Sequence, residues 1–471
     1  PSDVLIVTSI QKMSNIKNED GVNSHDIETI NGKRLVFIVD EAHRSTFGDM
    51  LITIKETFPM AIFFGFTGTP IHDENQKRMN TTSTVFGNEL HRYSIADGIR
   101  DKNVLGFDPY KVLTFKDKDV RKVVALEKAK ASSEEEAISN PAKAKIYYKF
   151  MNTSKVKMAG YYGNNGKYVK GIEDYIPTIQ YQSIEHQSKV VEDIAENWLT
   201  LSHNNKFYAI LATSSIPEAI EYYRLLKIKV PHLKTTCLFD PNIDNGGGVA
   251  FKEDGLVEII TDYNLRYQQD FSIATHGAFK KDIALRLAHK EHYKLLVRTP
   301  EKQLDLLIVV DQMLTGFDSK WVNTLYIDKM LEYENIIQAF SRTNRLFGPE
   351  KPFGTIRYYR RPHTMERNVN DAVKLYSGDK PIGLFVEKLS YNLNKMNEIY
   401  ADIVELFYRA SIPDFEKLPS DSTERAKFAS LFKDFNNYLE AAKIQGFSWE
   451  KDKYSFKKEN GNQKEIGRAH V

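Results

Sequence analysis

Four short strings in this sequence combine residue types that act on phosphate-bearing ligands. The first, Asp40-Glu41-Ala42-His43, follows the apolar run from Leu35 to Val39. Two acids at the end of a buried strand are costly unless they bind something. Asp40 could then hold Mg²⁺ on a nucleotide, and Glu41 could polarise the attacking water. Alternatively, the pair caps the helix that follows.

The second string, Thr67-Gly68-Thr69-Pro70, follows the next apolar run along the chain, Ala61 to Phe64. Small residues and hydroxyl groups there allow a ligand or a neighbouring domain to approach the backbone closely. Taken alone, the string is also typical of an ordinary turn. Its place shortly after the acid pair favours a part in the same site.

The third string runs from Gln338 to Arg345. Positions 338, 342 and 345 are spaced i, i+4, i+7, so a helix would present Gln338, Arg342 and Arg345 on one face. Two guanidinium groups aimed in one direction suit a triphosphate, where they neutralise charge during cleavage of the γ-phosphate. Without such a ligand, the pair would form a solvated basic stripe.

The fourth string, Asp311 to Asp318, follows an apolar run and contains a glycine that permits an unusual backbone angle, Gly316. Thr315 and Asp318 offer polar contacts to ribose, to DNA or to the arginine pair. The sequence contains no phosphate-binding loop of the G-x-x-x-x-G-K-[ST] type and no evident nuclease carboxylate set. We expect negligible ATP hydrolysis from this chain alone.

Short apolar runs ending in polar residues predict parallel strands that carry a site at their carboxyl ends. They occur in two regions, which predicts two α/β units separated by a Lys-, Glu- and Tyr-rich helical connector with a loop or hairpin at Gly163–Gly166. The run Val4 to Val7 is the first predicted strand, and residues 246–305 are predicted to decorate the surface. The predicted domains are 1–110, 111–189, 190–365 and a helical C-terminal domain over 366–471.

Composition narrows the possibilities further. A formal net charge of +2 gives no globally basic field, so any nucleic-acid binding must use a local groove. No run of about 18 apolar residues exists, so no membrane span is predicted. One cysteine, Cys237, indicates a reducing cytoplasm and excludes disulfides within the chain. The chain begins without Met, and we expect it to be part of a longer protein.

In this order the strings resemble the motifs of superfamily 2 helicase motors. Their flanks are more similar to the R subunit of type I restriction enzymes. The strings that carry this resemblance are Val39 to Ser45, Phe66 to Pro70, Met313 to Asp318, Asn323 to Lys329 and Gln338 to Arg345. Val7 to Met13 also resembles that family's motif Ib, and Thr213-Ser214-Ser215 resembles motif IV. The resemblance covers roughly residues 1 to 360.

The resemblance implies two RecA-like parallel-sheet motor domains that use ATP and Mg²⁺ to translocate double-stranded DNA. A nuclease domain and a phosphate-binding loop would precede Pro1, and methylation and specificity subunits would be partners. The implied catalytic residues are Asp40, which also holds the Mg²⁺, Glu41, Arg342 and Arg345. The implied nucleotide-binding residues are His43, Gly316, Asp318 and Gln338. The implied DNA-binding residues are Thr8, Gln11, Thr67 and Thr213.

Two alternatives remain open at this stage. One is another double-strand translocase of the same superfamily, such as a type III restriction motor or a remodeller. The other is a non-catalytic DNA-binding or assembly module, because this sequence lacks the loop that cradles the β- and γ-phosphates.

Overall fold

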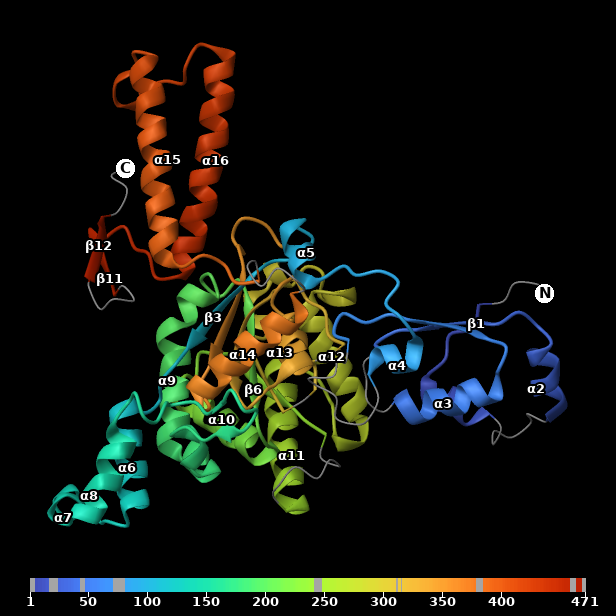
Figure 1. The fold of residues 1–471 in the computed structure, drawn as a ribbon. Helices are drawn as coiled ribbons and strands as arrows, with labels where there is room; N and C mark the ends of the chain where they lie inside the picture. The colour runs from blue at the N-terminus through green and yellow to red at the C-terminus, as the bar shows by residue number, and fades with distance from the viewer. Residues whose placement is uncertain are drawn as a thin grey trace.

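A six-stranded parallel sheet lies at the centre of the molecule (Figure 1). The computed structural model describes residues 5–16, 24–42, 47–70, 81–240, 248–310, 312–314, 316–377, 384–457 and 463–467. The strand order is β3-β10-β9-β6-β8-β7. The strands are β3 (Phe107–Lys111), β6 (Tyr208–Thr213), β7 (Thr235–Leu238), β8 (Leu306–Val309), β9 (Val322–Asp328) and β10 (Gly354–Tyr358).

Every residue of β6, β8 and β9 is buried, as expected for parallel strands covered on both faces. The predicted second α/β unit is thereby confirmed. The helices around this sheet are α9 (Ile184–Leu201), α10 (Ile216–Lys229), α11 (Val249–Tyr267), α12 (His276–Ala288), α13 (Tyr333–Phe340) and α14 (Pro362–Tyr376).

The prediction that residues 246–305 only decorate the surface is wrong. Ile259 of α11 and Phe279 and Ile283 of α12 are completely buried and belong to the main hydrophobic core. In α11 and α12 the apolar residues recur on one face of each helix, while many charged residues lie on the other faces. The segment is therefore polar on average although it contains a buried apolar stripe.

The N-terminal unit contains a two-stranded parallel sheet of β1 (Val36–Val39) and β2 (Ile62–Gly65). Its helices are α1 (Ile10–Ser14), α2 (Ser24–Asn31), α3 (Phe47–Thr57) and α4 (Thr82–Phe86), whereas α5 (Ile95–Arg100) packs against the main hydrophobic core through Ile95, Ala96 and Ile99. The strand predicted at Val4–Val7 does not form in its described part, because residues 5–9 are irregular and pair with neither β1 nor β2. A strand needs a partner to satisfy its backbone, and apolar character alone does not provide one.

Most of strand β3 lies within residues 1–110, which were predicted to form the N-terminal unit, but the strand pairs with β10 at the edge of the six-stranded sheet. The other edge of β3 is hydrogen-bonded to residues 384–386. Phe107 N donates to Leu384 O at 2.8 Å, and Val386 N donates to Phe107 O at 2.9 Å. Pro109 lies within the strand and lacks an N–H group, which an edge strand tolerates.

The connector contains helices and a hairpin, as predicted. Its elements are α6 (Asp117–Ala129), α7 (Glu134–Ser139), α8 (Pro141–Met151), β4 (Tyr161–Tyr162) and β5 (Tyr168–Val169). The two short strands pair antiparallel around Gly166, whose φ is 71°. Short 3-10 turns lie at Glu173–Tyr175, Thr178–Gln182, Ile273–Thr275, Glu291–Tyr293, Leu296–Arg298, Pro300–Lys302 and Pro413–Phe415.

The C-terminal region is a long helical pair, α15 (Leu389–Arg409) and α16 (Ser422–Ile444), which projects from the body of the molecule (Figure 1). An antiparallel hairpin of β11 (Lys453–Lys457) and β12 (Gln463–Gly467) follows it, which the sequence did not predict. Among the described residues, no helix combines the length and apolar character required to cross a bilayer. The domain boundaries remain a prediction.

Candidate functional site

The acid pair lies at the carboxyl end of β1, where the backbone turns sharply. Asp40 and Glu41 are exposed, and an Asp40 carboxylate oxygen accepts a hydrogen bond from Glu41 N at 2.9 Å. Glu41 adopts φ 52°, a left-handed conformation that is uncommon outside glycine. The turn brings Ala42 N to Phe66 O at 3.0 Å, which ties the ends of β1 and β2 together. Strained backbone of this kind clusters at functional sites.

The string Thr67 to Pro70 continues directly from β2. Thr69 N donates to Thr67 Oγ1 at 3.1 Å, and Thr69 is buried. Gln338 Nε2 of α13 donates to Thr69 Oγ1 at 3.0 Å. This bond joins the N-terminal unit to the second unit, so the second and third strings of the sequence are in direct contact.

Helix α13 ends earlier than the residue spacing predicted. It stops at Phe340, and Arg342 and Arg345 lie in the turn and extended segment beyond it, so the prediction of one continuous helical face is wrong. Thr343 Oγ1 donates to Phe340 O at 2.9 Å, and Leu105 N donates to Asn344 O at 2.8 Å. These bonds hold the chain in a non-helical path.

The two arginines nevertheless point to the same neighbouring loop. Arg342 Nη1 donates to Phe317 O, and Arg345 forms an ion pair with Asp318. Gly316, with φ 71°, supplies the left-handed turn that was anticipated from the sequence.

Burial and the positive charge of Arg345 lower the pKa of Arg342, while Asp318 and Glu41 act in the opposite direction. His43, the fourth residue of the first string, lies outside the described residues.

The residues implied to contact DNA differ in accessibility. Thr8 is exposed just before α1, and Gln11 is exposed in its first turn, where Ser9 caps the helix. Thr67 is half-buried. Thr213 is completely buried, and its hydroxyl donates to Val309 O at 3.3 Å, so this side chain is not available to DNA. The end of β6 is covered, which the sequence could not reveal.

A buried ionic network covers the carboxyl ends of β6 and β9. Asp328 is fully buried and is bonded by His186 Nε2 at 2.9 Å and Tyr222 OH at 2.8 Å. Arg360 donates to the same carboxylate from Nε and Nη2, each at 3.2 Å, and also pairs with Glu218. Burial alone would raise the pKa of Asp328, but the bond and charge of His186 and the charge of Arg360 hold it below its usual value.

This network fastens the connector to the sheet. His186 lies in the first turn of α9, its Nδ1 lies 2.8 Å from Thr114 Oγ1, and Arg360 Nη2 donates to Tyr181 O at 3.1 Å. Sequence reasoning did not single out these residues. Asp328 gave the same signal as Asp40, an acid that ends a buried strand, and that signal could have identified it.

The carboxylates suit a metal that is carried on a nucleotide rather than one held by protein ligands alone. Within the described ranges, no cluster of three or more His, Cys, Asp or Glu residues could hold a metal ion. Mg²⁺ is commonly bound by one or two carboxylates together with substrate phosphates. Asp40, exposed at the strand end, fits that arrangement.

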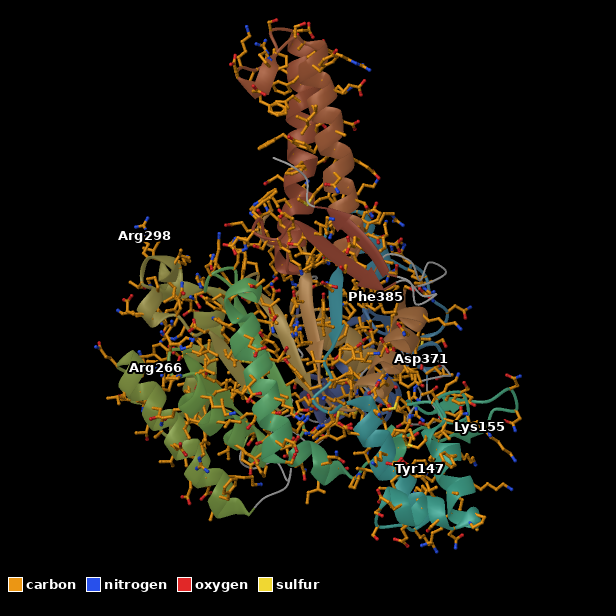
Figure 2. The ribbon with its side chains drawn as sticks, turned by 90° about the vertical axis from the view of Figure 1, so that its left-hand side faces the viewer. Tyr147, Lys155, Arg266, Arg298, Asp371 and Phe385 are labelled. Atoms are coloured by element: carbon orange, nitrogen blue, oxygen red, sulfur yellow. The ribbon has the colours of Figure 1, made fainter. Side chains whose placement is uncertain are left out.

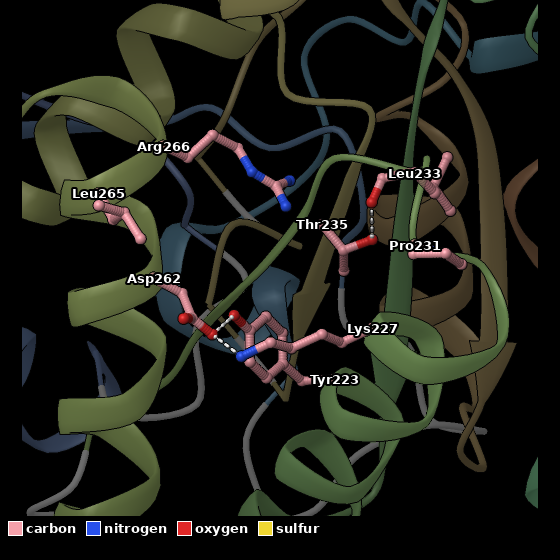
Figure 3. Close-up of a pocket in the computed structure, with 8 residues that line it drawn as sticks. All are labelled: Tyr223, Lys227, Pro231, Leu233, Thr235, Asp262, Leu265 and Arg266. Atoms are coloured by element: carbon pink, nitrogen blue, oxygen red, sulfur yellow. Dashed lines mark hydrogen bonds and ion pairs between the residues drawn. The ribbon is translucent and has the colours of Figure 1, made fainter.

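A pocket of about 260 Å³ lies elsewhere, between α10, α11 and the start of β7 (Figure 3). Lys227 and the Tyr223 hydroxyl both contact Asp262 there, and Arg266 points toward Thr235. None of the motif residues lines it, so we do not assign it to the site described above.

Two family models match the chain. Residues 205–361 match the model described as type I restriction enzyme subunit R domain 3, and residues 1–141 match the SWI2/SNF2 ATPase model. The parallel-sheet fold and these matches define the class, a superfamily 2 motor.

Curated relatives identify the family. An endonuclease subunit of the type I restriction enzyme SauMSSORF170P of Staphylococcus aureus strain MSSA476 is 36% identical over 382 residues, which is 79% of this chain and 35% of the relative. The corresponding subunit of SsaAORF53P from Staphylococcus saprophyticus is 32% identical over 384 residues, with the same coverage. The chain belongs to the type I restriction enzyme R subunit family and spans about a third of the length of these relatives.

Solved structures show more distant likenesses. A fragment of a putative HsdR subunit of a type I restriction enzyme from Vibrio vulnificus YJ016 is 14% identical, with a TM-score of 0.37. The match covers 74% of this chain and 46% of that one.

Proposed function

We propose that this chain is the motor part of an R subunit, which couples ATP hydrolysis to movement along double-stranded DNA. DNA cleavage would then belong to a nuclease domain outside these residues. The carrying observation is that the second and third strings meet across the two units, where Gln338 Nε2 donates to Thr69 Oγ1 at 3.0 Å.

Each charged group has a role in this proposal. Asp40 would hold Mg²⁺ on the triphosphate, which supplies Lewis-acid stabilisation of the phosphate oxygens. Glu41 would orient and polarise the attacking water. Arg342 and Arg345 would neutralise the charge that develops on the γ-phosphate. Asp318 pairs with Arg345, Gly316 provides the left-handed turn of the same loop, and Gln338 joins the two units.

The DNA contacts would be made to phosphates, because a motor that moves over any sequence cannot depend on base contacts. Thr8, Gln11 and Thr67 are the accessible candidates from the N-terminal unit. Sequence recognition would come from specificity and methylation subunits assembled with the R subunit.

The arginine pair provides the test. In the full-length R subunit, Arg342→Ala or Arg345→Ala should lower DNA-stimulated ATP turnover by about 10³ to 10⁵, because arginine fingers act on the transition state. Lysine should not restore activity, since it lacks the planar fork. The control is Arg425→Ala, an exposed arginine on α16, which should keep full turnover.

Melting curves would show that the variants are folded. If the arginine variants keep more than about a tenth of wild-type turnover, the catalytic assignment is wrong.

A further inference from the structure

One segment of the connector has a high density of positive charge, and none of its residues belongs to the candidate site described above. We call residues 153–171, which include β4 and β5, the connector hairpin. It contains four lysines, Lys155, Lys157, Lys167 and Lys170, and no acidic residue. All four are exposed, and none is in an ion pair with another residue that the structure describes. By contrast, Lys122 of α6 pairs with Glu134 at 2.5 Å.

Aromatic rings are interleaved with these lysines. Tyr162 is 73% exposed, and its ring lies 5.2 Å from that of Tyr168. Lys157 Nζ lies 4.5 Å from the centre of the Tyr161 ring. Exposed tyrosines beside lysines pack well against sugar–phosphate backbone, where the ring covers the sugar and the hydroxyl can reach a phosphate.

The base of the hairpin is closed tightly. Ile172 N donates to Lys157 O at 2.9 Å, and Glu173 N donates to Met158 O at 3.0 Å. A Cβ atom added to Gly171 would lie 2.3 Å from the backbone of Ala159, so glycine is required for this approach. The lysines are therefore presented on a defined scaffold.

The hairpin is also fixed to the second unit through the start of α14. The buried Glu173 carboxylate accepts bonds from His363 N at 3.0 Å and Thr364 N at 2.7 Å, so it caps that helix. From the same helix, Arg367 donates to Gly160 O and to Tyr168 OH, the latter at 3.2 Å. The hairpin is therefore attached directly to the unit that contains the six-stranded sheet.

This anchor places the hairpin at the carboxyl edge of the sheet, because α14 begins shortly after β10 ends. Ligands of parallel sheets bind outside this edge. Thr213, which the sequence assigned to DNA from the same edge, is completely buried. In Figure 2, Lys155 lies at the outer limit of the connector, on the side of the molecule that carries Asp371 of α14.

We propose that the connector hairpin is a DNA-contacting element of the second unit, binding the phosphate backbone of duplex DNA through its four lysines with Tyr162 against the sugars. The inference rests on the proposed motor function. The Asp174 carboxylate at the base of the hairpin accepts hydrogen bonds from Tyr168 OH at 3.0 Å and Gly171 N at 2.8 Å, and no ion pair joins it to the four lysines among the described residues. Lysine is a point charge without a planar fork, which suits contacts that ignore sequence.

The experiment measures binding of the 471-residue chain to a labelled duplex of random sequence at several salt concentrations. The hairpin variant replaces all four lysines with glutamine. Its log Kd against log salt should have a slope lower by about 2 to 4 units, because each lost phosphate contact removes about 0.9. Replacing the same lysines with arginine should retain the wild-type slope.

A matched control removes the same charge elsewhere, by replacing four exposed lysines of the C-terminal region with glutamine: Lys417, Lys427, Lys433 and Lys451. Its slope should fall by less than one unit. An equal fall in the control and hairpin variants would overturn the proposal, as would an unchanged slope in the hairpin variant. If the wild-type chain binds no duplex even at low salt, the proposed function itself fails, which distinguishes the two.

Discussion

Loss of the Arg360 side chain should cost the second unit several kcal/mol of stability. It is 5% exposed and lies between two buried carboxylates, Asp328 and Glu218, which are 0% and 3% exposed. We consider Arg360→Met, which keeps much of the side-chain length but removes the charge. Both acids would then remain in the interior without the cation that compensates them.

The expected cost follows from this geometry. Removing one partner of a buried ion pair typically costs about 3 to 5 kcal/mol, because an uncompensated charge stays buried. Asp328 would keep His186 and Tyr222 as partners, which favours the lower half of that range. For a unit of this size, each kcal/mol lowers Tm by about 2 to 4 °C, so a fall of about 6 to 16 °C is expected.

Urea denaturation and thermal melting of the purified chain would measure this. The control is Arg409→Met, which removes an exposed arginine paired with Glu405 on α15 and should cost less than about 1 kcal/mol. In the double variant with Asp328→Asn, the two effects should be less than additive by roughly 1 to 3 kcal/mol. If Arg360→Met costs no more than the control, the network does not hold the connector as described.

Two further predictions concern single positions. Burial lowers the pKa of His289, which stacks on Trp321, to about 4. The unfolded chain protonates the His289 imidazole below about pH 6.5, whereas the folded protein does so only near pH 4. The free energy of unfolding of the wild-type protein should therefore fall by about 2 to 3 kcal/mol between pH 6.5 and 4, relative to that of the His289→Gln variant. Parallel pH profiles for the two proteins would contradict this. Gly171→Ala should increase amide hydrogen exchange across residues 157–174, because the added Cβ would meet the Ala159 backbone. The control is Gly166→Asn, at a position where φ is 71° and nothing lies within 4 Å of an added Cβ, and it should leave exchange unchanged. Equal exchange rates in the two variants would refute the close packing at Gly171.

The sequence was most informative where local pattern and structure share a cause. Apolar runs such as Leu306 to Val309 became buried parallel strands because a fully covered strand needs apolar residues on both faces. Gly316 adopted its left-handed conformation because only glycine does so without cost. In both cases the deciding physics acts within a few residues.

Prediction was weaker where distant segments decide the outcome. The non-helical path of the chain after α13 includes a hydrogen bond from Leu105 N to Asn344 O, and Leu105 is far away in sequence. The burial of Thr213 depends on the segments that pack over the end of β6. The pairing of β3 with β10 could not be inferred from residues 107–111 alone, because an edge strand has no local mark of its partner. The roles assigned to the site residues remain proposals.

The hydrogen bond between Leu105 and Asn344 lies within the body that contains the six-stranded sheet, because α5, which precedes Leu105, packs against the same core. Only a short stretch of chain separates the end of α5 from β3, and Leu105 lies within it. Asn344 is the immediate neighbour of Arg345, so this bond fixes the backbone that carries the arginine pair to the body of the molecule. The bond between Gln338 and Thr69, by contrast, is one that a rotation of the N-terminal unit would have to break.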